Sequence, residues 1–168
     1  MKKQIVTLLA SLSLISFISI PTESLAAGTA TGTLAATATV SAKCVVDSTT
    51  NVTFGTVDPT TAGNYDGTGT IVTHCSKNTQ VFIWVAPSVA GVLKMTSPTT
   101  LDSITYTLFS NTGRTTVFPS VTGGAKATQP GTPVTTTLYG RVVVGSGVND
   151  TVAAATDYTQ ALTATIEW

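Results

Sequence analysis

The sequence has little charge. Asp, Glu, Lys and Arg make up 10% of its 168 residues, and the formal net charge at pH 7 is +0. No cluster of Lys and Arg forms the basic patch that binding to nucleic acid requires. Hydroxyl groups must therefore solvate much of the surface, and the chain has 36 Thr. Thr is β-branched and fits the half-exposed surface of a sheet, so the composition favours an all-β protein. A Ser/Thr-rich glycosylated stalk is the alternative, but only seven prolines and regularly spaced aromatic residues argue against it.

Residues for catalysis and metal binding are also scarce. His74 is the only histidine, and only two cysteines are present, whereas a zinc site needs three or four ligands. No Gly-x-Ser-x-Gly motif supplies a nucleophile. Glycoside hydrolysis requires two acidic side chains that converge on the substrate. The acidic residues of this chain are instead scattered through turn-like contexts. The sequence predicts no catalytic residue, no metal site and no cofactor, and therefore a protein that is not an enzyme.

No apolar run is long enough to span a membrane. The longest, residues 5–20, is interrupted by five hydroxyl residues, follows Lys2 and Lys3, and precedes a small-residue site that ends at Ala26. This arrangement predicts a secretory signal peptide over residues 1–26. A retained membrane anchor is the alternative, but 16 residues fall short of the roughly 20 that a span needs. Removing two lysines and one glutamate with the signal leaves 142 residues with six basic and seven acidic groups, a net charge of −1.

Cys44 and Cys75 are the only cysteines. Because an exported protein folds in an oxidising compartment, they are expected to form a disulfide. Closing a loop of 32 residues, counting both cysteines, stabilises the fold by about 3–4 kcal/mol on the chain-entropy model. A redox or metal role would need a Cys-x-x-Cys motif or further ligands nearby, and the sequence has neither.

Residues 29–44 alternate almost without a break between small or apolar residues at even positions and Thr, Ser or Lys at odd positions. At about 3.3 Å per residue they would extend roughly 53 Å, whereas strands usually span about 17–20 Å. Part of this segment should therefore lie outside its own domain and complete the sheet of another molecule. We predict a donor-strand arm over residues 27–36 and a first strand of the chain's own domain over residues 37–44. The arm residues expected to face the acceptor core are Ala30, Gly32, Leu34 and Ala36. A disordered terminus is the alternative, but a disordered segment has no reason to alternate small or apolar residues with polar residues so strictly.

Short strand-like runs separated by Gly, Pro, Asn and Asp follow the arm. This spacing predicts a single antiparallel β-sandwich over residues 37–168, since apolar residues nowhere recur at helical spacing over three turns. The runs are residues 51–57, 68–75, 81–86, 104–109, 116–121, 134–144 and 160–168.

The last run alternates apolar and polar residues up to the end of the sequence. In an immunoglobulin-like sandwich another strand should follow it, so its absence would leave an apolar cleft and an open edge. An ordinary last strand within a complete sandwich is the alternative. The spare arm and the cleft are complementary, which indicates a head-to-tail contact that propagates as a fibre. The residues expected on the acceptor strand are Leu162, Ala164, Ile166 and Trp168.

Several short motifs follow the arm in a fixed order. They are Cys44-Val45-Val46, Phe54-Gly55, Val72-Thr73-His74-Cys75, Leu101 with Tyr106-Thr107-Leu108-Phe109, and Leu138-Tyr139-Gly140-Arg141-Val142. The order and spacing of these landmarks resemble the spore coat protein U family, which includes the subunits of archaic chaperone-usher pili. The chain departs from the family pattern at residues 156–160, which replace a Gly-x-Tyr-x-Asp turn, and at Phe118, which stands where a tryptophan is common.

The resemblance implies an incomplete immunoglobulin-like sandwich that lacks its last strand and is completed by the donor strand of a neighbouring subunit. It also implies identical or homologous subunits joined head-to-tail, a periplasmic chaperone, an outer-membrane usher, and export through the periplasm to an extracellular fibre. Such fibres support surface attachment and biofilm formation.

Two other functions are compatible with the sequence. One is a self-contained secreted module that binds carbohydrate or acts as an adhesin, with Trp84 or Tyr65 as a stacking platform. We expect Trp84 to pack in the core and Tyr65 to lie in a turn, which weakens this alternative. The other is a spore or cyst coat component that assembles without a pilus.

Overall fold

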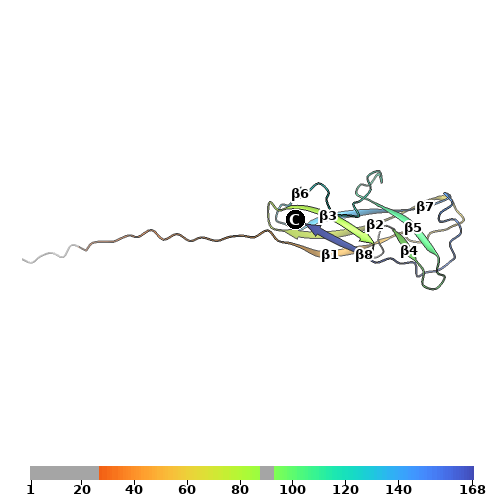
Figure 1. Cartoon of the computed structure of the whole chain (residues 1–168), viewed down its shortest axis with the longest axis horizontal. Coiled ribbons are helices and arrows are strands. Elements are labelled where there is room, and N and C mark those ends of the chain that lie inside the picture. The colour runs from red at the N-terminus through yellow and green to blue at the C-terminus, as the bar shows by residue number, and fades with distance from the viewer. Residues whose placement is uncertain (1–26, 88–92) are drawn as a thin grey trace, which may run out of the picture. The chain divides into compact units, whose positions relative to one another are not determined.

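A computed structural model describes residues 27–87 and 93–168, and it divides the chain into a unit ending at residue 38 and a domain of residues 39–168 (Figure 1). The predicted signal peptide lies outside the described residues. In the first unit, residues 27–38 form no strand and are exposed. None of the described residues belongs to a helix long and apolar enough to cross a membrane.

The domain is built from antiparallel strands in two sheets. The larger sheet has the order β1-β2-β7-β5-β4, and the smaller has the order β6-β3-β8. The strands are β1 (Cys44–Thr53), β2 (Gly63–Cys75), β3 (Gln80–Pro87), β4 (Lys94–Thr96), β5 (Ser103–Phe109), β6 (Ala127–Thr128), β7 (Val134–Val144) and β8 (Leu162–Glu167).

This topology is that of an incomplete immunoglobulin-like sandwich. The order β1-β2-β7-β5 matches strands A, B, E and D of the immunoglobulin fold, and the pair β3-β8 matches strands C and F. Strand G would pair with the other edge of β8, and no strand in the described part of the chain does so. The predicted fold class is confirmed.

The first strand differs from the expectation. Residues 37–43 form no strand, and a single strand, β1, replaces the predicted runs over residues 37–44 and 51–57. The reason lies in the register, because Cys44 at the start of β1 is opposite Cys75 at the end of β2. Residues before Cys44 therefore extend past the end of β2. The sequence alternates through residues 37–44, but alternation shows only which residues would share a face and not where pairing begins.

Side chains from both sheets form the core, with Ile71, Leu108 and Val142 among the most deeply buried. A smaller cluster contains Val81 and the predicted disulfide between Cys44 and Cys75, which is confirmed.

Trp84 does not pack in the core as expected. Its neighbours Ile83 and Val85 pack inward, so strand alternation places Trp84 on the outer face of β3, where it is half-buried. Tyr65 lies within β2, not in a turn, and its hydroxyl lies 3.1 Å from the carbonyl oxygen of Asp58 and 3.2 Å from that of Thr61, so it can donate to either one. Neither residue forms an open stacking platform.

A candidate acceptor groove between two sheet edges

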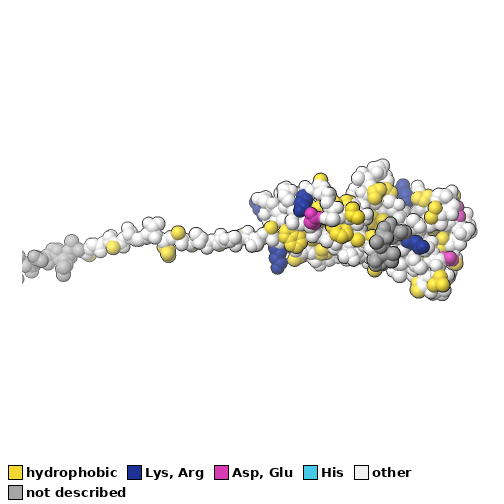
Figure 2. All heavy atoms as spheres, viewed as in Figure 1, with side chains coloured by type: hydrophobic (Ala, Val, Ile, Leu, Met, Phe, Trp, Pro, Cys, Tyr) yellow, Lys and Arg dark blue, Asp and Glu magenta, His cyan; other side chains and the backbone are white. Residues whose placement is uncertain are grey.

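A groove of about 1060 Å³ lies between the second half of β1 and the start of β8. One wall is formed by residues 49–57, and the other by Leu162, Ala164 and the segment 152–161 that leads into β8. Hydrophobic side chains reach the surface around β1 and β8 in the view of Figure 2. The groove therefore separates the edge strand of one sheet from the edge strand of the other.

The floor of the groove is the hydrophobic core itself. Ile71, Val85 and Leu138 line the groove, yet each is at most 4% exposed. The apolar side chains of the walls are only partly covered and pack against the same core cluster. A segment lying in the groove would therefore remove core surface from water. The partly covered wall residues are Val52, Phe54, Val57, Met95, Val152, Tyr158, Leu162 and Ala164.

Glycines in β2 and β7 position the β1 wall. A Cβ atom at Gly140 would lie 2.7 Å from the ring of Phe54 and from the side chain of Val52. A Cβ atom at Gly69 would lie about as close to the Val52 side chain. Because these positions carry no side chain, the end of β1 lies directly over the neighbouring strands. The Phe54 ring then packs edge-on against Tyr106, with 5.4 Å between ring centroids.

Polar groups beside the groove form hydrogen bonds with other groups of the same domain. The Tyr106 hydroxyl donates to Gln160 Oε1 at 2.7 Å, and the Lys94 amide donates to the same oxygen at 2.8 Å. The side chain of Asn149 accepts from the Thr105 amide and donates to two carbonyl oxygens. Burial raises the pKa of Tyr106 to about 12, so this phenol is uncharged at neutral pH. The groove can therefore hold an apolar segment without burying a charge of its own.

Stability should fall between pH 10 and pH 12 because of Tyr106. The unfolded chain releases the phenol proton near pH 10, whereas the folded protein keeps it until about pH 12. The contribution of this group to the free energy of unfolding is therefore complete below pH 10 and is lost as the pH passes 12. Urea unfolding across this range should show a steeper loss for the wild type than for Tyr106→Phe. Tyr139→Phe is the matched control, and equal slopes for Tyr106→Phe and the wild type would contradict the assignment.

Both edge strands offer unpaired backbone groups to the groove. Among the described strands, β1 pairs only with β2, and β8 pairs only with β3. Each edge therefore presents a row of amide and carbonyl groups, which favours the addition of another strand. The arrangement can bind an extended peptide through its backbone and through alternate side chains directed at the core.

The structure brings together only some of the predicted site residues. Leu162 and Ala164 line the groove, Ile166 packs against the disulfide cluster, and Trp168 follows the last residue of β8 with 54% of its surface exposed. The predicted arm residues Ala30, Gly32, Leu34 and Ala36 are exposed and outside any strand. The sequence does not predict that Val52 and Phe54 form the opposite wall, although Phe54-Gly55 is one of the landmarks of the resemblance.

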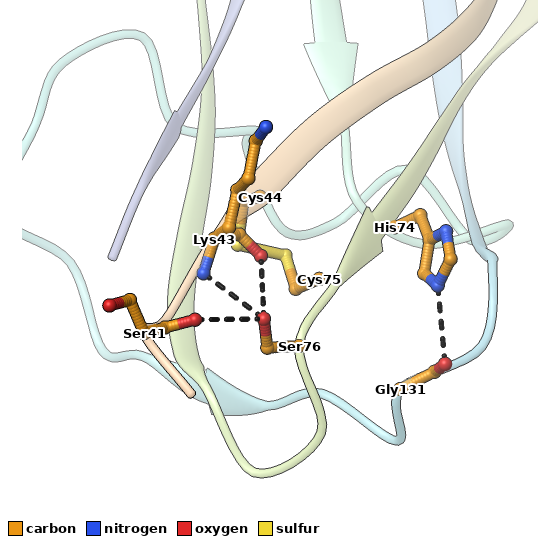
Figure 3. Close-up of a disulfide and its surroundings, with 7 residues drawn as sticks. All are labelled: Ser41, Lys43, Cys44, His74, Cys75, Ser76 and Gly131. Atoms are coloured by element: carbon orange, nitrogen blue, oxygen red, sulfur yellow. Dashed lines mark hydrogen bonds between the residues drawn. A yellow bond between two sulfur atoms is a disulfide. The ribbon is translucent and has the colours of Figure 1, made fainter. Parts of the chain in front are cut away.

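His74 is accounted for by a structural contact. Its Nε2 atom lies 3.2 Å from the carbonyl oxygen of Gly131, beside the disulfide (Figure 3). In residues 27–87 and 93–168, no three His, Cys, Asp or Glu side chains are grouped so that they could hold a metal ion.

The profile of the Spore Coat Protein U domain matches residues 30–165. The chain belongs to this family. The resemblance predicted from the sequence is confirmed. A search of curated proteins found no match.

A chain in one solved structure has the same fold. It is the crystal structure of the CsuC-CsuE chaperone-tip adhesion subunit pre-assembly complex from archaic chaperone-usher Csu pili of Acinetobacter baumannii. The spore coat protein U domain chain is 21% identical to the matched chain, with a TM-score of 0.52. The match covers 77% of this chain and 40% of the other.

Proposed function

We propose that this spore coat protein U domain protein is a structural subunit of an extracellular fibre of the archaic chaperone-usher type, which polymerises by donor-strand exchange. The observation that carries the proposal is the apolar groove between β1 and β8, whose floor is the core of the domain. The same chain carries an exposed, two-faced segment, residues 27–36, that would fill the groove of the next subunit. The contact is head-to-tail, so it propagates as a fibre.

The arm and the groove match in length and chemistry. Ten residues of arm extend about 33 Å, and the nine residues 49–57 of the groove wall would span roughly 30 Å if extended. Leu34 is 94% exposed, and burying its side chain contributes roughly 1.5–3 kcal/mol. Ala30, Gly32 and Ala36 are small, so most of the remaining gain comes from backbone hydrogen bonds at about 1 kcal/mol each. The binding energy is spread along the arm, with Leu34 as its one large anchor.

An open groove also accounts for the proposed partners. Before assembly, the exposed core surface would promote aggregation, so a periplasmic chaperone must cover it. The chain with the same fold was solved in a complex of a chaperone with a pilus subunit, which supports this step. An outer-membrane usher would then deliver the subunits to the cell surface, where the fibre would support attachment and biofilm formation.

The proposed exchange predicts that an aspartate reduces assembly at one arm position and has no effect at the adjacent one. Leu34→Asp would place a carboxylate in the apolar groove and should reduce assembly by more than about tenfold, the minimum for losing a buried leucine. Thr33→Asp changes the other face of the arm and should leave assembly intact. An unheated denaturing gel measures the result, as a ladder for exchanged subunits and a single band for monomers. Equal ladders for the two variants would refute the exchange.

The alternative functions predict other outcomes for the same variants. A self-contained binding module would be monomeric whatever residue occupies position 34. A coat component could give the ladder but not isolated fibres, which electron microscopy would show. The positions of Trp84 and Tyr65 give the binding module little support, since one is half-buried and the other has its hydroxyl engaged.

A further inference from the structure

The arm could in principle fill the groove of its own subunit. A hairpin with a two-residue loop at Ser41 and Ala42 would bring residues 30–34 opposite Thr49–Thr53, which lines the groove. An intramolecular partner of this kind acts at an effective concentration of about 1 mM, on the order of a thousandfold above a subunit concentration near 1 μM. A subunit that could form this hairpin would cap itself and would not polymerise.

The structure holds the chain in another path at this point. The carbonyl oxygen of Lys43 accepts from the Ser76 amide at 2.8 Å, which continues the β1–β2 ladder one step beyond the disulfide. The Lys43 amide in turn donates to Ser76 Oγ at 3.2 Å. The same hydroxyl lies 3.4 Å from the carbonyl oxygens of both Ser41 and Lys43 and can donate to either one (Figure 3). We call this set of hydrogen bonds the Ser76 clasp.

The clasp works together with the disulfide and the local sequence. The bond between Cys44 and Cys75 fixes the chain immediately after the clasp. Residues 40–43 are Val, Ser, Ala and Lys, with none of the Gly, Asn or Asp that two-residue hairpin loops require. Residues 41–43 are therefore held in line with β1, at the end of β1 farther from the residues that line the groove.

We propose that the Ser76 clasp prevents the arm from folding back into its own groove, and so directs strand exchange to a second copy of the chain. The proposal rests on the proposed function, since it specifies which copy supplies the strand. Ser76 acts as a positioning residue, because it contacts the base of the arm and not the groove.

The test replaces the clasp by a turn in the mature chain. The turn variant carries Ser41→Asn, Ala42→Gly and Ser76→Ala, and it should raise the ratio of monomer to oligomer at least about tenfold at equal protein concentration. The matched control exchanges Ser41→Ala with Ala42→Ser, which keeps the backbone contacts and adds no turn residue. Gel filtration and an unheated denaturing gel measure the ratio. Digestion with elastase shows whether the arm of the monomer is protected, as it must be if the arm fills its own groove.

The outcomes separate this inference from the proposed function. If the wild type forms no ladder, the proposed function fails. Two results would refute the role of the clasp in keeping the arm out of its own groove, given a ladder in the wild type. One is the same ladder in the turn variant, and the other is a monomeric turn variant whose arm is digested. If the turn variant does not fold, the single variant Ser76→Ala provides the test. It should also raise the ratio of monomer to oligomer and give a monomer whose arm is protected from digestion. An unchanged ratio in Ser76→Ala would then overturn the inference.

Discussion

Deletion of residues 27–36 is expected to abolish assembly while the domain of residues 39–168 stays folded and able to bind the missing segment. The deleted residues form no strand and are exposed, so their loss removes no core contact. The groove is built entirely from residues of the domain and should persist. The unheated gel should change from a ladder to a single band.

A synthetic peptide of residues 27–43 should restore the missing strand without restoring the fibre. At a peptide concentration of 100 times its Kd, binding stabilises the folded domain by about 2.7 kcal/mol, which corresponds to a rise in Tm of roughly 10 °C for a domain of this size. A peptide carrying Leu34→Asp is the control and should give a much smaller rise. A deletion variant that still forms a ladder, or a domain whose Tm the wild-type peptide does not change, would contradict donor-strand exchange.

The double variant Cys44→Ala with Cys75→Ala is expected to lose about 3–4 kcal/mol of unfolding free energy. The disulfide joins residues 31 positions apart, so it restricts the unfolded chain substantially. It also belongs to the small core cluster with Val81, against which Ile166 packs. Since a domain of this size has a total stability of only about 5–15 kcal/mol, the loss is a large share of it.

Urea unfolding measures this loss, and hydrogen exchange locates it. Amide protons in the first half of β1 should exchange faster in the double variant, because β1 is an edge strand that is fixed at its first residue by the disulfide. The wild type under reducing conditions is the matched control and should lose a similar amount. A loss below about 1 kcal/mol would show that the strand pairing alone holds β1 in place.

Strands with clear boundaries were predictable from the sequence. The run over residues 134–144 is β7 with the same bounds, and β3, β5 and β8 lie within two residues of their predicted ends. Each has alternating or continuous apolar residues bounded by turn-forming residues, so local pattern and tertiary pairing agree. The disulfide was predictable as well, because the chain has only two cysteines.

Features that depend on pairing between distant segments were not predictable. The run over residues 116–121 forms only an isolated bridge between Val117 and Phe109, and two residues later the carbonyl oxygen of Pro119 accepts from the Val85 amide of the other sheet. Residues 81–85 are apolar throughout, so the pattern could not show that Trp84 faces outward. The β1 wall of the groove depends on glycines in two other strands, whose close approach no local pattern reveals.

The position of the disulfide has a mechanical consequence for a fibre of such subunits. Tension passed along an arm would enter each subunit at the hydrogen bonds of the Ser76 clasp and then at Cys44, the first residue of an edge strand. Hydrogen bonds at the end of an edge strand would open one after another under such a pull. The covalent bond to Cys75 instead transfers the force to β2, whose residues 63–73 pair with β7 inside the sheet. A stretched fibre would therefore keep its subunits folded where the pull is greatest.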